Sequence, residues 1–190
     1  MELQPDWKEF LSLLMRHGVR FVVIGAHALA ANGRPRYTED FDVFVEPSTA
    51  NARRVVKALV AFGFGAKANA WREFAQPDKI LFIGRRPLRI DVLTSISGVT
   101  FDAAWRGRLI ASTDIGDVPV LGITELRRNK AASGRTKDLF DLALLDEGST
   151  PVASRSRSKP RRRAAPPSRT RGKAAPRTPE KRKPKPKPKR

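Results

Sequence analysis

The stretch IGAHALAANGRPRYTEDFDVFVEPS, residues 24–48, decides the fold because it joins a glycine turn to a strand that carries two carboxylates. Asp40 and Asp42 lie in the apolar run DFDVFV, and residues i and i+2 of a strand point to the same face. Burying a carboxylate costs several kcal/mol unless a cation or hydrogen bonds compensate for it. The stretch therefore predicts a half-buried strand whose two acids need a positive partner.

The charge of the chain divides it into two parts. The 190 residues include 38 Lys and Arg against 19 Asp and Glu, a formal net charge of +19. Residues 151–190 hold 17 of the basic residues, one acid and nine of the 15 prolines, but no Leu, Ile, Phe, Tyr or Trp. Such a segment cannot bury enough apolar surface to fold. We expect one compact domain over residues 1–148 and a disordered basic tail over residues 149–190.

Several classes of protein are disfavoured by what the sequence lacks. The chain has no cysteine and only two histidines, which leaves zinc and copper sites with little support. No apolar run approaches the ~20 residues that span a bilayer. The start, MELQPDWKEF, lacks the basic and apolar regions of a secretory signal. We therefore expect a soluble cytoplasmic protein without a membrane partner.

Apolar periodicity predicts helices that alternate with strands and then a pair of helices. The expected helices are at 6–18, 26–33, 49–64 after an N-cap at Ser48, 101–108, and 124–148 with a break at Ser133–Gly134. The expected strands are at 19–25, 39–46, 78–84 and 88–95, the last two joined as a hairpin, with two edge strands within 109–122. This order predicts an α/β domain, a mixed sheet flanked by helices, with a small helical part at its C-terminal end.

A third carboxylate, Asp91, lies in the expected strand at 88–95. If that strand neighbours the one with Asp40 and Asp42, three acids converge and suit a hard cation such as Mg²⁺. Asp91 could instead pair with an arginine such as Arg89. The turn Gly25–Ala26 leads from a strand into a helix, where backbone N–H groups and the helix dipole favour a phosphate. A phosphate cradle beside a metal site is what nucleotidyl transfer needs.

These residues resemble the nucleotidyltransferase superfamily that has the DNA polymerase β-like palm, particularly its small stand-alone prokaryotic members. The resemblance covers roughly residues 8–146, and some of those members serve in toxin–antitoxin and phage-abortive systems. It is carried by Gly25–Ala26, by Asp40 and Asp42 after thirteen intervening residues, and by Asp91 in a later strand.

The resemblance implies a role for each matching residue. Asp40, Asp42 and Asp91 would hold Mg²⁺ or Mn²⁺, with Asp91 also helping to activate the attacking hydroxyl, and Gly25 and Ala26 would grip the triphosphate. Lys130, Arg135 and Lys137 match basic positions that could face the nucleotide, although surface charges often occur at such positions.

The activity implied is metal-dependent transfer of NMP from an NTP to a hydroxyl of RNA, a protein or a small molecule, with release of pyrophosphate. Two other functions stay open. Ala26 replaces the usual Gly or Ser and removes a hydroxyl, which favours a catalytically weak binding module of a toxin–antitoxin pair. The tail at residues 151–190 favours a protein that acts by binding DNA or RNA with little base preference.

Overall fold

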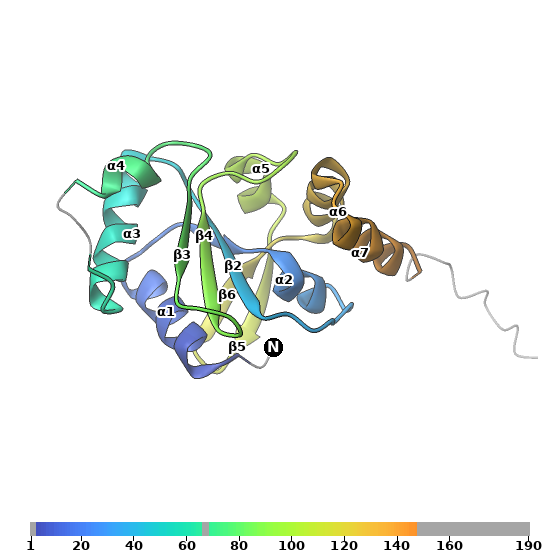
Figure 1. Ribbon diagram of the computed structural model, residues 1–190, viewed down its shortest axis with the longest axis horizontal. Helices are drawn as coiled ribbons and strands as arrows, with labels where there is room; N and C mark the ends of the chain where they lie inside the picture. Colours follow the sequence, from blue (N-terminus) through green and yellow to red (C-terminus); the bar gives the residue numbers. More distant parts are fainter. Residues whose placement is uncertain (1–2, 66–68, 148–190) are drawn as a thin grey trace, which may run out of the picture. The chain divides into compact units, whose positions relative to one another are not determined.

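The computed structural model describes residues 3–65 and 69–147, which form one sheet with helices on both sides (Figure 1). The strands are β1 Phe21–Val23, β2 Asp40–Val45, β3 Ile80–Ile83, β4 Arg89–Leu93, β5 Leu109–Thr113 and β6 Gly116–Val120. The helices are α1 Pro5–Arg16, α2 Gly25–Ala31, α3 Thr49–Ala61, α4 Trp71–Phe74, α5 Phe101–Arg106, α6 Ile123–Ser133 and α7 Thr136–Glu147. The predicted tail at residues 149–190 lies outside the described residues.

The sheet has six strands in the order β3-β4-β2-β1-β6-β5 and mixes parallel with antiparallel pairs. β2 is parallel to β4 and antiparallel to β1, and β3 and β4 form the predicted antiparallel hairpin. The helical pair α6 and α7 is divided at Gly134, which has the left-handed conformation of a C-cap. The predicted α/β class, with its flanked mixed sheet and C-terminal helical part, is confirmed.

Strand β2 holds the centre of the core. Phe41, Val43 and Val45 are fully buried on the face opposite Asp40 and Asp42. Trp7 of α1 stacks on Phe41 with the ring centroids 5.3 Å apart. α1 and α3 pack on this face because their apolar residues recur at helical spacing.

The imidazole of His27, on α2, belongs to this core. It lies edge-on to Trp7 and to Phe41, with centroid distances of 5.0 Å in both pairs. Burial lowers the pKa of His27 to about 4, so the side chain is neutral at pH 7. Its Nε2 atom has no hydrogen-bond partner within the described residues. These contacts favour a structural role for His27.

Three local expectations were wrong. Of β5 and β6, only β5 is an edge strand, because β6 also pairs with β1, at Val23 and Val120. This pairing begins after Pro119, so the missing N–H of that proline interrupts no β1–β6 ladder. The apolar spacing of residues 49–64 also predicts Val60 in the core stripe of that helix, but Val60 is 55 % exposed. The buried stripe of α3 runs through Ala52, Val55, Ala58 and Leu59 instead. The short helix α4 was not expected.

None of the helices in the described ranges is long and apolar enough to cross a membrane.

Candidate active site

The parallel pairing of β2 with β4 brings the predicted carboxylates together. Asp42 is directly opposite Asp91, and Asp40 is opposite Arg89. All three acids line one pocket of about 610 Å³. The same pocket is lined by every other residue predicted for the site, from three further parts of the chain: Gly25, Ala26, Lys130, Arg135 and Lys137.

The turn at Gly25 is built against Asp42. Gly25 has φ +66°, and a Cβ atom placed on it would lie 2.1 Å from Oδ2 of Asp42. The backbone N–H of Ile24 donates a hydrogen bond to the carbonyl oxygen of Asp42, at 3.0 Å. Only glycine accommodates both the left-handed backbone and the close carboxylate. The first turn of α2 therefore begins beside the acids.

Two arginines of the β3–β4 hairpin neutralise two of the acids. Arg89 donates from Nε and Nη2 to Asp91, at 2.7 and 2.8 Å, and its Nη2 also lies 3.2 Å from Oδ2 of Asp40. Arg86 donates a second pair of hydrogen bonds to Asp40, at 3.2 and 2.9 Å. The pairing of Asp91 with Arg89 is the alternative that the sequence had left open.

Asp42 is left without such a partner. Its carboxylate makes no hydrogen bond or ion pair within residues 3–65 and 69–147. Burial raises the pKa of Asp42, and the nearby charges of Asp91 and Asp40 raise it further. Exposed Lys137 opposes this shift through its charge. Asp42 is thus the one acid of the three whose ionised form lacks a cation in contact.

The fit of a divalent metal to these acids depends on the arginines. Three carboxylates are the oxygen donors that Mg²⁺ and Mn²⁺ prefer, and unpaired Asp42 favours a cation. Across the part of the chain that the structure describes, no group of three or more acids or histidines is arranged to hold a metal ion. The Arg89 guanidinium lies within ion-pair distance of both Asp40 and Asp91. The donor chemistry fits, but binding through all three acids requires Arg89 to move.

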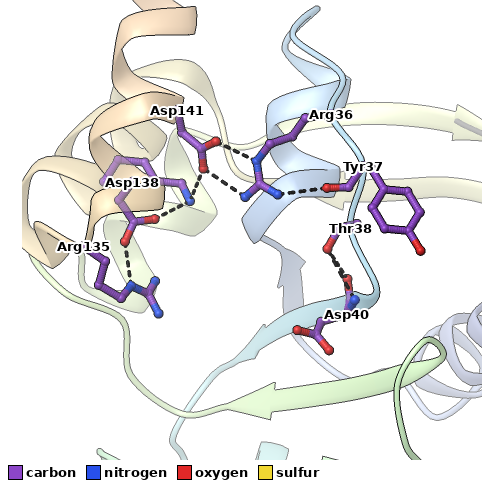
Figure 2. Close-up of polar contacts among 8 residues, drawn as sticks. Arg36, Tyr37, Thr38, Asp40, Arg135, Asp138 and Asp141 are labelled. Carbon is purple, nitrogen blue, oxygen red and sulfur yellow. Dashed lines mark hydrogen bonds and ion pairs between the residues drawn. The ribbon is translucent and has the colours of Figure 1, made fainter.

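The basic residues of α6 and α7 differ in their environments. Nζ of Lys130 lies 2.7 Å from both Asp138 and Asp141, and this lysine is only 3 % exposed. Arg135 donates to Asp138, and Arg36 donates to Asp141 (Figure 2). The charge of Lys130 is therefore already balanced by two buried acids. Lys130, which was predicted to face the nucleotide, thus also has a structural role.

The pKa of Asp138 shows the strength of this network. Burial alone would raise it, but hydrogen bonds from Lys130 and Arg135 outweigh burial and lower the pKa of Asp138 to about 2. Arg135 has a side chain that is 62 % exposed, and Lys137 has no hydrogen bond or ion pair within the described ranges. Of the three predicted cations, Arg135 and Lys137 are the ones able to reach a ligand.

Sequence reasoning missed the acidic partners of this network. Asp138 and Asp141 were not assigned a site role, yet both are fully buried in α7. Their spacing of three residues, continued by buried Leu145, places them on the inner face of the helix. Two acids on the apolar face of a helix were the available signal that a buried cation lies opposite.

Apolar residues form one wall of the pocket. Phe82 and Ile80 of β3 are each 55 % exposed, and both line the pocket. The register pairs Phe82 with Asp91 and Ile80 with Leu93, so these side chains share the face of the carboxylates. From the sequence this strand was expected to be an ordinary apolar strand of the sheet.

No family model and no curated protein matches the chain. Among solved structures, a Thermotoga maritima protein provisionally named a nucleotidyltransferase is similar, with a TM-score of 0.47 and 16 % identity. The match covers 77 % of this chain and 96 % of that one. A likeness of this extent shows neither the activity nor the substrate of the present chain.

Proposed function

We propose that the chain is a nucleotidyltransferase that moves NMP from an NTP to an acceptor hydroxyl. The observation that carries this proposal is the opposition of Asp42 and Asp91 across parallel strands, with the Gly25 turn packed against Asp42. Carboxylates beside a strand-to-helix turn are an arrangement suited to phosphoryl chemistry. The pocket that they share is about 610 Å³, large enough for a nucleotide.

Each residue has a distinct task in the proposed reaction. The backbone N–H groups of Gly25 and Ala26 bind the triphosphate, with Lys137 and Arg135 offsetting its charge. The acceptor oxygen bonds to the α-phosphorus, and the bond from that phosphorus to the oxygen bridging to the β-phosphorus breaks. Pyrophosphate leaves, and the hydroxyl proton passes to a carboxylate oxygen of Asp91. Both oxygens of Asp91 accept from Arg89 in the structure, so this proton transfer also requires Arg89 to turn away.

The acids Asp40, Asp42 and Asp91 would hold Mg²⁺ or Mn²⁺ in this proposal. Such an ion supplies charge neutralisation for the phosphates when bound. Asp42 needs no rearrangement to accept a cation, since it has no ion-pair partner in the described ranges. Asp40 and Asp91 would need Arg89 to turn away, because its guanidinium pairs with both.

The test compares Asp42→Asn with the parent and with Asp117→Asn. Asp117 is an exposed acid of β6 that does not line the pocket, so its replacement controls for general loss of negative charge. We expect transfer of radiolabelled NMP to cell-extract acceptors by the parent and by Asp117→Asn, and none by Asp42→Asn. Equal labelling by all three proteins would end the proposal.

A second candidate is a catalytically weak binding module, with a toxin or antitoxin as its partner. Two observations favour it: Arg86 and Arg89 already neutralise Asp40 and Asp91, and Ala26 brings no hydroxyl to the phosphate turn. A ligand that binds only the folded state raises its melting temperature by mass action. The transferase predicts that Mg²⁺ with NTP stabilises the parent. The binding module predicts stabilisation only after Arg89→Met removes the competing guanidinium.

A further inference from the structure

The apolar wall of the pocket has no role in the binding of phosphate. Phe82 and Ile80 each stay 55 % exposed, although Phe82 is directly opposite buried Asp91. A half-exposed phenylalanine next to a buried carboxylate leaves apolar area in contact with water, which is unfavourable. This wall is therefore a surface that a flat apolar group would cover favourably.

The order of the strands assigns the wall to one side of the reaction. From the end of β1 to β3, the pocket presents Gly25, then Asp42, then Asp91, then Phe82. If the triphosphate lies at Gly25, pyrophosphate departs on that side. The attacking and leaving oxygens are roughly in line in phosphoryl transfer. The acceptor must then approach over Asp91, from the side of Phe82.

The charge around the wall indicates which acceptor fits. Arg85 and Arg86 are exposed on the β3–β4 hairpin, and Lys79 is exposed just before β3. The acids on this side are Asp78, Asp91 and Asp40, of which Asp40 is paired with Arg86 and Asp91 with Arg89. The Arg89 guanidinium lies 4.8 Å from the Phe82 ring centroid, so it supports one side of the ring and leaves the exposed part free. An aromatic platform flanked by cations is the combination that binds single-stranded nucleic acid, through base stacking and phosphate contacts.

We propose that the β3 side of the pocket is the acceptor subsite, and that it binds the 3′-terminal nucleotide of a single-stranded nucleic acid with its base on Phe82. This inference rests on the proposed transferase activity, since it names the acceptor of that reaction. The terminal hydroxyl then lies over Asp91, on the side from which in-line attack is open.

The test is photo-cross-linking of the full chain to an oligonucleotide with 4-thiouridine at a 3′-deoxy terminus. We expect the label on the peptide that contains Phe82. Because stacking contributes about 1–3 kcal/mol for each base, Phe82→Ala should weaken this cross-linking about 5- to 150-fold. Phe82→Trp should keep it. Phe140→Ala is the matched control, since Phe140 is 61 % exposed on α7 and does not line the pocket.

Two outcomes would overturn the inference. One is a cross-link that maps only to residues 151–190 or is unchanged in Phe82→Ala. The other is labelling of the Phe82 peptide by 4-thio-UTP but not by the oligonucleotide, which would assign the wall to the base of the NTP. The terminal nucleotide cannot react, so the cross-link reports on the surface even if no transfer is detected. Failure of the subsite is thereby distinguishable from failure of the proposed activity.

Discussion

Replacing Gly25 by alanine tests whether the turn at Gly25 and the carboxylate of Asp42 are built against each other. The new Cβ would lie 2.1 Å from Oδ2 and 3.0 Å from Cγ of Asp42. The residue would also have to keep φ at +66°, where glycine alone is unstrained. Alanine therefore brings two separate penalties, one from the backbone and one from the carboxylate.

The size of each penalty follows from the geometry. A left-handed backbone costs an L-residue roughly 1–2 kcal/mol. The overlap with Oδ2 forces Asp42 to move by about 1 Å, a displacement that can reduce catalysis about 100-fold. Residues in contact show coupling energies of about 0.5–3 kcal/mol. In a domain of this size each kcal/mol lowers the melting temperature by about 2–4 °C.

A double-mutant cycle separates the two penalties without relying on any activity. The free energy of unfolding in urea is measured for the parent, Gly25→Ala, Asp42→Ala and the double variant. We expect Gly25→Ala to cost less in the Asp42→Ala background, by about 1–3 kcal/mol, because the carboxyl group is gone. Gly63→Ala is the control, since Gly63 has φ +85° and a Cβ placed on it would meet no atom within 4 Å. Gly63→Ala should be destabilised only by the cost of the left-handed backbone.

The reasoning is refuted if the coupling between the two sites is below about 0.5 kcal/mol, the range found for independent sites. Equal destabilisation by Gly25→Ala and Gly63→Ala would have the same meaning. Either result would place the Asp42 carboxylate away from the turn, and the phosphate site proposed there would lose its basis.

Three further predictions concern stability. Lys130→Met should lower the free energy of unfolding by about 3–5 kcal/mol at pH 7, because Asp138 and Asp141 lose a buried partner. The pKa of Asp138 is lowered from 3.8 to about 2. The stabilisation that this carboxylate contributes is therefore present above pH 3.8 and is lost as pH falls through about 2. Urea titrations would contradict this if the difference in unfolding free energy between the parent and Lys130→Met stayed constant from pH 7 to pH 2. Asp42→Asn should abolish transfer and raise the melting temperature at pH 7. The pKa of Asp42 is raised in the folded protein, so the parent loses stability as pH rises through that pKa. A lower melting temperature for Asp42→Asn in calorimetry would refute this prediction. Asn51→Ala should cost at least about 2 kcal/mol in urea unfolding, since fully buried Asn51 satisfies both the N–H and the carbonyl of Arg20, and a loss below about 0.5 kcal/mol would show that water replaces these bonds.

Much of the fold could be predicted because local signals agreed with the tertiary contacts. Ser48 caps α3 as expected, with its side chain accepting from the N–H of Asn51. Gly134 ends α6 in the left-handed conformation. The two acids of β2 shared a face because the spacing of side chains in a strand is fixed at two residues. In each case the relevant information lies within a few residues of the chain.

The partners of the charged groups could not be predicted in the same way. Arg86 reaches Asp40 from 46 positions away, and Arg36 reaches Asp141 from 105 positions away. Which cation meets which acid depends on the strand order and on the docking of α7, neither of which is encoded locally. The exposure of Phe82 depends similarly on β3 being an edge strand. Long-range pairing therefore accounts for the features of the site that the sequence left open.

The balance of charge in the pocket points to Asp42 as the residue that a ligand must satisfy. Arg86 and Arg89 match the charges of Asp40 and Asp91, which leaves one carboxylate unmatched by contact. That carboxylate is costly to ionise, because burial and both neighbouring acids raise its pKa. It is also the one held against Gly25, where a phosphate would approach. A cation that arrives together with a triphosphate would relieve this cost without breaking either arginine pair, whereas binding at Asp40 and Asp91 must first displace Arg89. Arg89→Met should therefore increase the stabilisation by Mg²⁺ alone more than the stabilisation by Mg²⁺ with NTP.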